Sequence, residues 1–249
     1  MKSFAALMLL LLTPLMVCAQ DREKQLDRVQ EAGEVLKEIM AAPDKGIPEE
    51  ILSSASCVAV IPSMLKAGFV FGGEYGHGVA SCRTEKGWSA PAFFGVKAGT
   101  VGLQIGGQAV DLVMLVMNDR GMRNLLSSKF ELGADASVAA GPVGRHAEGA
   151  TDWKLRAQVL TYSRSRGIFG GLTLKGASIR QDKDDTRLFY GRMVPYRTLL
   201  TGELAPTPDA KPFLEALAKY SPVQPTTRPT PATPGQAVAE EKDKDKQAK

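Results

Sequence analysis

The chain has 249 residues, of which 44% are apolar and 23% are charged, and its formal net charge is +4 at pH 7. This length and composition allow one domain or two small ones with a substantial hydrophobic core. The mild basic excess lacks the dense Lys/Arg stripe of a nucleic-acid-binding surface, so we expect no nucleic-acid partner. The 25 glycines, together with apolar stretches that have no helical period, favour a sheet protein with tight turns.

Residues 1–19 have the pattern of a secretory signal peptide. Lys2 supplies the positive start, residues 4–17 form an apolar run, and Ala19 ends a small-residue cleavage motif. The run is short for a helix that spans a bilayer. We therefore expect the chain to be exported, to be periplasmic or secreted, and to lose residues 1–19. Lipid modification of Cys18 is a weaker alternative, because a valine precedes it where a lipoprotein signal needs a small residue.

Two cysteines remain after that cleavage, Cys57 and Cys82. In an oxidising compartment they could form a disulfide that contributes about 2–4 kcal/mol. The sequence leaves open whether their Cα atoms approach each other. The chain has no CxxC or HxxxH spacing, so we expect no metal site and no cofactor.

Residues 21–42 are predicted to form an amphipathic helix, because apolar side chains recur at helical spacing from Leu26 to Met40. The helix could pack on the domain or lie on a membrane surface. Its polar face mixes acids with bases, which argues against strong attraction to an anionic membrane. A second short helix is predicted over residues 48–55, with Pro48 in its first turn.

A series of predicted strands follows. Residues 57–62 are a short apolar run of the kind that is buried on both faces, and residues 68–83 are two strands around a glycine turn or one long bent strand. Later segments complete the pattern: strands within 87–118 and 129–145, two strands that meet at Gly167, and helices over 119–128, 182–191, 196–202 and 210–220. The predicted fold class is α+β, with a strongly bent antiparallel sheet, close to a barrel, flanked by a few helices.

The composition changes at Ser221, where a Pro/Thr-rich stretch leads into alternating charges. Without large apolar side chains this segment cannot repay the entropy of ordering, so we expect residues 221–249 to be disordered. The predicted organisation is a signal peptide (1–19), one domain with an N-terminal helix (20–205), a short C-terminal helix (206–220) and this tail.

The chain contains no nucleophile elbow, no P-loop and no dinucleotide-binding glycine motif. The two histidines, His77 and His146, have glycines nearby and are expected to be exposed turn residues. Residues 73–78 are expected to form a tight turn. No acid–base pair or activated nucleophile is recognisable, so we expect no enzymatic activity.

Several motifs occur in a fixed order between about residues 27 and 191: CVAVIP (57–62), GWSAP (87–91), VGLQIG (101–106), LGADAS (132–137), YSRSRGIFGG (162–171) and LFYG (188–191). This pattern resembles the SYLF family, also called the Ysc84 actin-binding family, in its bacterial exported form. The resemblance implies a lipid-binding module, since eukaryotic relatives bind phosphoinositide membranes and fungal relatives also bind and bundle actin. The expected partner is therefore a phospholipid or a membrane surface. The alternative is a structural or protein-interaction module of the envelope, with an envelope protein as partner.

The residues predicted to contact lipid are Arg164, Arg166, Lys175, Tyr162 and Trp88. On a strand, Arg164 and Arg166 share one face about 7 Å apart, a separation that suits two oxygens of a phosphate group. Lys175 could join them from the next strand. Tyr162 could lie at an apolar boundary with its hydroxyl in water, and Trp88 could stand at a rim or plug the core. Two alternatives for the arginines stay open, a solvated strand face and an internal pair with Asp111 or Asp135.

Overall fold

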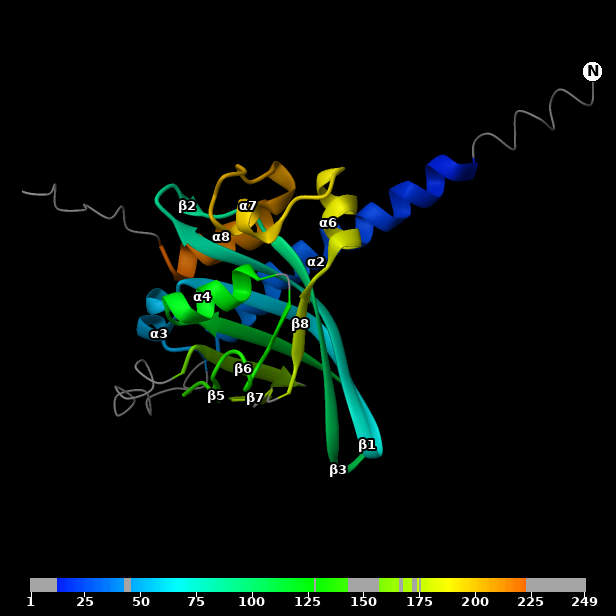
Figure 1. Ribbon diagram of the computed structural model, residues 1–249, viewed down its shortest axis with the longest axis vertical. Helices are drawn as coiled ribbons and strands as arrows, with labels where there is room; N and C mark the ends of the chain where they lie inside the picture. The colour runs from blue at the N-terminus through cyan, green and yellow to red at the C-terminus, as the bar shows by residue number, and fades with distance from the viewer. Residues whose placement is uncertain are drawn as a thin grey trace, which may run out of the picture.

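The computed structural model describes residues 13–42, 46–127, 129–142, 157–165, 168–171, 174 and 176–222. Two very long antiparallel strands dominate it, β1 (Cys57–Thr84) and β3 (Ala92–Val116), which pair from Cys57↔Val116 to Ala80↔Ala92. Both strands bend strongly, and Figure 1 shows them side by side as a ribbon that runs out past the other elements. Residues 73–78 lie inside β1, so the tight turn expected there is wrong, and of the two alternatives for residues 68–83 the structure has the long bent strand.

The described residues form one eight-stranded sheet in the order β2-β1-β3-β6-β5, with β7 beside β6 and β8 between β3 and β4. The shorter strands are β2 (Gly87–Trp88), β4 (Lys129–Glu131), β5 (Val138–Ala140), β6 (Val159–Ser165), β7 (Ile168–Gly171) and β8 (Ser178–Gln181). The predicted α+β class and strong bending are confirmed. The pairs are antiparallel except for β5 and β6, which are parallel, so the sheet is mixed.

The helices are α2 (Thr13–Met40), α3 (Glu49–Ser54), α4 (Asp119–Leu126), α6 (Lys183–Tyr190), α7 (Tyr196–Leu200) and α8 (Lys211–Tyr220), with a 3-10 turn η2 (Pro208–Ala210) before the last. The starts of α4 and α6 follow from the sequence, since the Asn118 side chain accepts from the Gly121 N–H and the Asp182 side chain accepts from the Asp185 N–H. Helix α2 contacts β1, α6 and α8 (Figure 1), and a Cβ at Gly33 would come within 2.5 Å of the Pro212 carbonyl oxygen. The predicted N-terminal helix therefore packs on the domain.

Helix α2 begins at Thr13, upstream of the cleavage site predicted after Ala19. Within the described residues, no helix combines the length and the apolar character that crossing a membrane needs. The predicted export signal is not tested by this geometry and stays a prediction. The tail predicted from Ser221 lies outside the described residues beyond Pro222.

Apolar side chains fill both faces of the curled sheet. Cys57, Ala59 and Ile61 face the inside of the curl, whereas Val58 and Val60 face the layer formed by α2 and α8. This alternation confirms that residues 57–62 are buried on both faces. Strand β1 thus contributes alternate side chains to two core clusters, one inside the curl of the sheet and one beneath α2 and α8.

The two ends of β1 meet. The Arg83 N–H donates to the Ser56 carbonyl oxygen at 2.8 Å, although the two residues lie 27 positions apart in the sequence. Beside this contact, Cys57 and Cys82 form a disulfide with their Cα atoms 3.9 Å apart. The structure therefore joins the two candidate cysteines and closes β1 into a loop.

Candidate functional site

Arg164 on β6 is held by two carboxylates. Its Nε donates to Asp111 Oδ2 at 2.8 Å across the strand pair, and its guanidinium also pairs with Glu38 of α2. Asp111 in turn accepts from the Ser63 N–H at 2.9 Å, beside the irregularity in β1. Of the alternatives stated for Arg164, the structure has the internal pair with Asp111, which leaves this guanidinium engaged and beneath a helix.

Tyr162 and Trp88 both lie inside the fold. Tyr162 is 3% exposed, its ring packs against Gly141, and burial raises the pKa of its hydroxyl. Trp88 donates through Nε1 to the Ser221 carbonyl oxygen at 3.1 Å and lies under the Arg83 guanidinium, 4.8 Å from its ring centre. Trp88 therefore plugs the core and anchors the C-terminal helix. The other two predicted contacts, Arg166 and Lys175, lie outside the described residues.

A charged cluster joins three distant segments where α2 crosses α6. His77 of β1 contacts Asp182 through Nδ1 at 2.8 Å, and the same nitrogen lies 3.5 Å from an Asp185 oxygen. From α2, Gln25 donates to Asp185 at 2.8 Å and Arg28 forms an ion pair with the same carboxylate. The expectation that His77 is an exposed turn residue is wrong, because it is a half-buried strand residue; His146 lies outside the described residues.

The pKa values of the cluster follow from these contacts. Hydrogen bonds to Asp182 first and Asp185 second raise the pKa of His77 to about 10, against an opposing effect of burial. Burial alone would raise the pKa of Asp185, but His77 and Arg28 hold it well below its usual range. The cluster is therefore a set of two cations and two anions at neutral pH. It is charge-balanced without an added ion.

His77, Asp182 and Asp185 are also the described residues best placed to ligate a metal, since their donor atoms all lie within 4.8 Å of one another. A divalent cation there would have to displace the His77 proton and compete with Arg28 for Asp185. The donor set fits a metal poorly for this reason. The cluster is better explained as a latch that fastens α2 and α6 to β1.

The latch predicts a pH dependence of stability. Because the pKa of His77 is raised from 6.5 in the unfolded chain to about 10 in the folded one, its contribution is fully present below pH 6.5 and is lost between pH 6.5 and 10. We expect the urea midpoint of the wild type to fall over that interval. The His77→Gln variant should start lower and show a flatter profile, and an equally steep profile in the variant would contradict the assignment.

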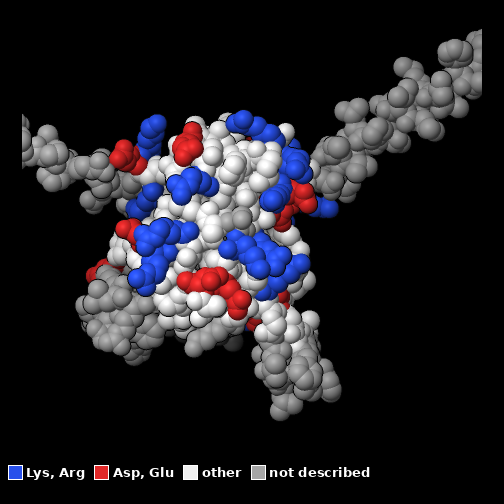
Figure 2. Space-filling view, in the orientation of Figure 1, with Lys and Arg blue, Asp and Glu red and all other residues white. Residues whose placement is uncertain are grey.

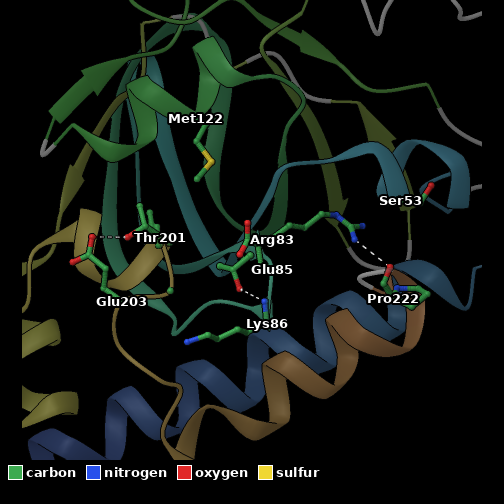
Figure 3. A pocket seen from close by; sticks show the side chains of 11 residues that line it. Ser53, Arg83, Glu85, Lys86, Met122, Thr201, Glu203 and Pro222 are labelled. Atoms are coloured by element: carbon green, nitrogen blue, oxygen red, sulfur yellow. Dashed lines mark hydrogen bonds between the residues drawn. The ribbon is translucent and has the colours of Figure 1, made fainter. Parts of the chain in front are cut away.

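A cavity of about 930 Å³ lies where the β1–β2 turn meets the end of α7 and the C-terminal segment. Figure 3 shows Arg83 reaching across it toward Pro222, with Lys86 and Glu203 on its walls. The Arg83 guanidinium donates to the carbonyl oxygens of Ala55 at 2.8 Å and Pro222 at 3.2 Å, and burial lowers its pKa. This cation therefore holds the segment that follows α8. On the cavity wall the Thr201 hydroxyl donates to Glu203 Oε1 at 3.0 Å, and this hydroxyl–carboxylate pair is exposed to solvent.

The outer face of the sheet carries exposed cations. Register places Arg180 of β8 opposite both Lys129 of β4 and Gly95 of β3, and Lys97 lies two residues from Gly95 on the same face. We call Lys97, Lys129 and Arg180 the basic strip. All three are exposed, and none has an ion-pair partner within the part of the chain that the structure describes. Figure 2 shows Lys and Arg side chains gathered beside β8 and over α4.

The basic strip was not predicted from the sequence. Its members come from three segments that are far apart along the chain, and each is a single lysine or arginine without a neighbouring motif. Only the pairing of β8 with both β3 and β4 brings them together. Arg164 and Arg166, two positions apart, form a more conspicuous pattern in the sequence. In the structure, however, Arg164 forms an internal ion pair with Asp111.

Comparison with known proteins identifies the family. A family model described as Ysc84, Las17-binding protein actin regulator, matches residues 97–220. SH3 domain-containing YSC84-like protein 1 is 34% identical in Xenopus laevis over 200 residues, covering 77% of this chain and 59% of the relative. The mouse protein of that name is 32% identical over 219 residues, covering 77% of this chain and 64% of the relative. Protein YSC84 of Saccharomyces cerevisiae is 34% identical over 178 residues, covering 70% of this chain and 38% of the relative.

The chain thus spans well under two thirds of the length of most of these curated relatives, from 38% of the yeast protein to 64% of the mouse protein. The words Las17-binding protein and actin regulator belong to the description of the family model. The matched segment includes β3 from Lys97 onward, the whole basic strip and Asp182 and Asp185 of the latch. On these matches, the chain belongs to the Ysc84 family.

Proposed function

We propose that this protein is a non-enzymatic binding module that attaches to anionic lipid headgroups at a membrane surface through the basic strip. The observation that carries the proposal is the set of three exposed cations on one face of three neighbouring strands, for which the described part of the chain supplies no ion-pair partner. Side chains two positions apart on a strand are about 7 Å apart, which is near the spacing of adjacent phosphate oxygens and headgroups. A cation near an anionic membrane contributes about 1 kcal/mol.

The proposed location is outside the cytoplasm. The predicted signal peptide and the disulfide between Cys57 and Cys82 support it, because disulfides persist in oxidising compartments. In that setting the ligand would be an anionic phospholipid of the surrounding membrane. The proposed contact uses the basic strip in place of Arg164, because the Arg164 guanidinium is engaged in internal pairs. Arg166 and Lys175 stay predicted lipid contacts.

The family description favours a second candidate, a module that binds another protein. The matching model is described as a Las17-binding protein and actin regulator, so protein binding is part of what relatives are named for. For this chain the corresponding partner would be an envelope protein bound without a specific lipid. Capture on vesicles free of other proteins separates the two candidates.

A vesicle co-sedimentation experiment tests the lipid proposal. Replacing Lys129 and Arg180 together by alanine removes about 2 kcal/mol of attraction, so we expect roughly 30-fold weaker binding to vesicles of phosphatidylcholine with phosphatidylglycerol. The matched control replaces Arg187 and Lys211, which pair on exposed helix surfaces with Asp184 and Glu215. The control changes the net charge equally and should change binding much less.

Two results would contradict the proposal. Equal loss in both double variants would mean that net charge alone governs attachment, without a specific strip. Failure of the wild type to sediment with anionic vesicles at low salt, where surface attraction is least screened, would exclude lipid binding altogether and leave the protein-binding candidate.

A further inference from the structure

The disulfide between Cys57 and Cys82 lies close to the cavity beside the β1–β2 turn but does not line it. Both cysteines are fully buried, and neither is among the described residues that form the cavity wall. Met122 of α4 does line the cavity, and Figure 3 shows this side chain pointing from the helix into it. The Met122 Sδ atom lies 3.2 Å from Cys57 Sγ. Met122 therefore stands between the disulfide and the cavity.

The backbone of Met122 is held firmly in place. Its N–H donates to the Asn118 carbonyl oxygen at 2.9 Å, and a Cβ at the neighbouring Gly121 would lie 2.8 Å from the Gln158 carbonyl oxygen. The Asn124 side chain donates to Gln158 Oε1 at 3.2 Å. Helix α4 therefore cannot move away from the disulfide without breaking these contacts. The Met122 side chain, in contrast, is only partly buried and has three rotatable bonds.

The position of the Met122 side chain matters because thiol–disulfide exchange needs direct contact between sulfur atoms. A thiolate must reach one sulfur of the disulfide and bond to it while the other sulfur leaves. On the cavity side of Cys57, the Met122 Sδ atom occupies the space that such a thiolate would need. Rotation of this side chain into the cavity, whose volume is about 930 Å³, would free that space without any movement of the backbone.

We propose that this cavity is the route by which a thiol reductant reaches the disulfide, and that the Met122 side chain is the gate on that route. The reductant is a small dithiol. One of its thiolates attacks Cys57 Sγ, the bond to Cys82 Sγ breaks, and Cys82 leaves as a thiolate. The second thiol of the reductant then displaces Cys57 and closes the reductant's own disulfide. The protein disulfide is thereby reduced, the dithiol is oxidised, and the two protons of the dithiol end on the two cysteines.

The gate makes the closure of β1 responsive to a reductant while the rest of the domain stays folded. Reduction removes the covalent link between the two ends of β1 and leaves the hydrogen bond from the Arg83 N–H to the Ser56 carbonyl oxygen. The Arg83 side chain also donates to Ser221 and Pro222 after α8. Freer ends of β1 therefore loosen the hold on that segment as well. This inference goes beyond the proposed function and does not depend on lipid binding.

The rate of disulfide reduction in the folded protein tests the gate. Dithiothreitol is added, samples are quenched in acid and alkylated under denaturing conditions, and mass spectrometry counts the two additional alkyl groups. We expect Met122→Ala to be reduced roughly tenfold faster than the wild type, because no packed side chain has to leave before the attack. Met122→Leu keeps an apolar side chain of similar size at the gate, so its rate should stay within about twofold of the wild-type rate.

Met117→Ala provides a matched control. Met117 is also partly buried, but it packs against the other core cluster, which includes residues of α2 and α8. Its truncation removes apolar packing and opens no path to the disulfide, so the reduction rate should stay near that of the wild type. Equal acceleration in Met117→Ala and Met122→Ala would mean that lost stability governs access, and this result would overturn the gate. A wild type that is reduced as fast as Met122→Ala would overturn it too.

A second measurement needs no variant and stays decisive if Met122→Ala does not fold. The reduction rate of the wild type is followed in increasing urea, below the unfolding transition. Rotation of one side chain exposes little surface, so the rate should depend only weakly on urea. A dependence as steep as that of global unfolding would show that only the unfolded chain is reduced, and it would rule out a route through the cavity.

Discussion

Replacing Cys57 and Cys82 together by alanine is expected to lower the free energy of unfolding by about 3 kcal/mol. The disulfide closes a segment of 25 residues, and a cross-link of that length restricts the unfolded chain by about this amount. Both side chains are buried, so alanine avoids introducing a hydroxyl into the core. Urea unfolding of the oxidised wild type and of the double variant measures the difference.

The oxidised and reduced wild type provide the control for that prediction. Reduction of the wild type should reproduce most of the effect of the double substitution. A double variant as stable as the oxidised wild type would mean that the hydrogen bond between Arg83 and Ser56 holds the ends of β1 without help.

The second large effect is expected for Asp185→Asn, which should cost about 3 kcal/mol. This carboxylate accepts from Gln25, pairs with Arg28 and lies against His77, and its removal leaves two partly buried cations with a single anion. The pKa of His77 should fall in the variant, since one of its two carboxylate partners is gone. Urea unfolding and NMR titration of the histidine ring measure the two consequences.

Asp184 on the same helix offers a matched control. Its side chain is 88% exposed and pairs with Arg187 three residues away, so Asp184→Asn should change stability by less than about 0.5 kcal/mol. Equal effects of the two substitutions would mean that the helix α6 needs acidic residues in its first turn and that the latch contributes little.

Much of the fold could be predicted because its signals are local. The helices over 49–54, 119–126, 183–190 and 211–220 lie within one or two residues of the predicted limits at most ends, since capping residues and glycines mark them. The apolar run 57–62 was correctly predicted to be buried on both faces. The length of β1 could not be decided, because glycines at 72, 73, 76 and 78 serve both turns and bent strands.

The candidate site was harder to predict because it depends on pairing between distant strands. The period of two correctly places Tyr162 and Arg164 on one face, and that face turned out to lie beneath α2. His77 was misjudged for a related reason: the glycines around it suggested a turn, and its partners Asp182 and Asp185 lie more than 100 residues away. The basic strip was missed for the same reason: its residues come together only through strand pairing, which local sequence patterns do not reveal.

The contact between α2 and α8 also constrains when the protein can finish folding. The N-terminal helix covers the sheet together with the last helix, and Gly33 is pressed against Pro212 near the far end of the chain. In a growing polypeptide, the part of the first helix around Gly33 that packs on α8 therefore lacks this partner until nearly 180 more residues have been synthesised. Such a chain stays open for a long time and is exposed to aggregation. We therefore expect that a chaperone which binds the unfinished chain until the last helix is made raises the yield of folded protein.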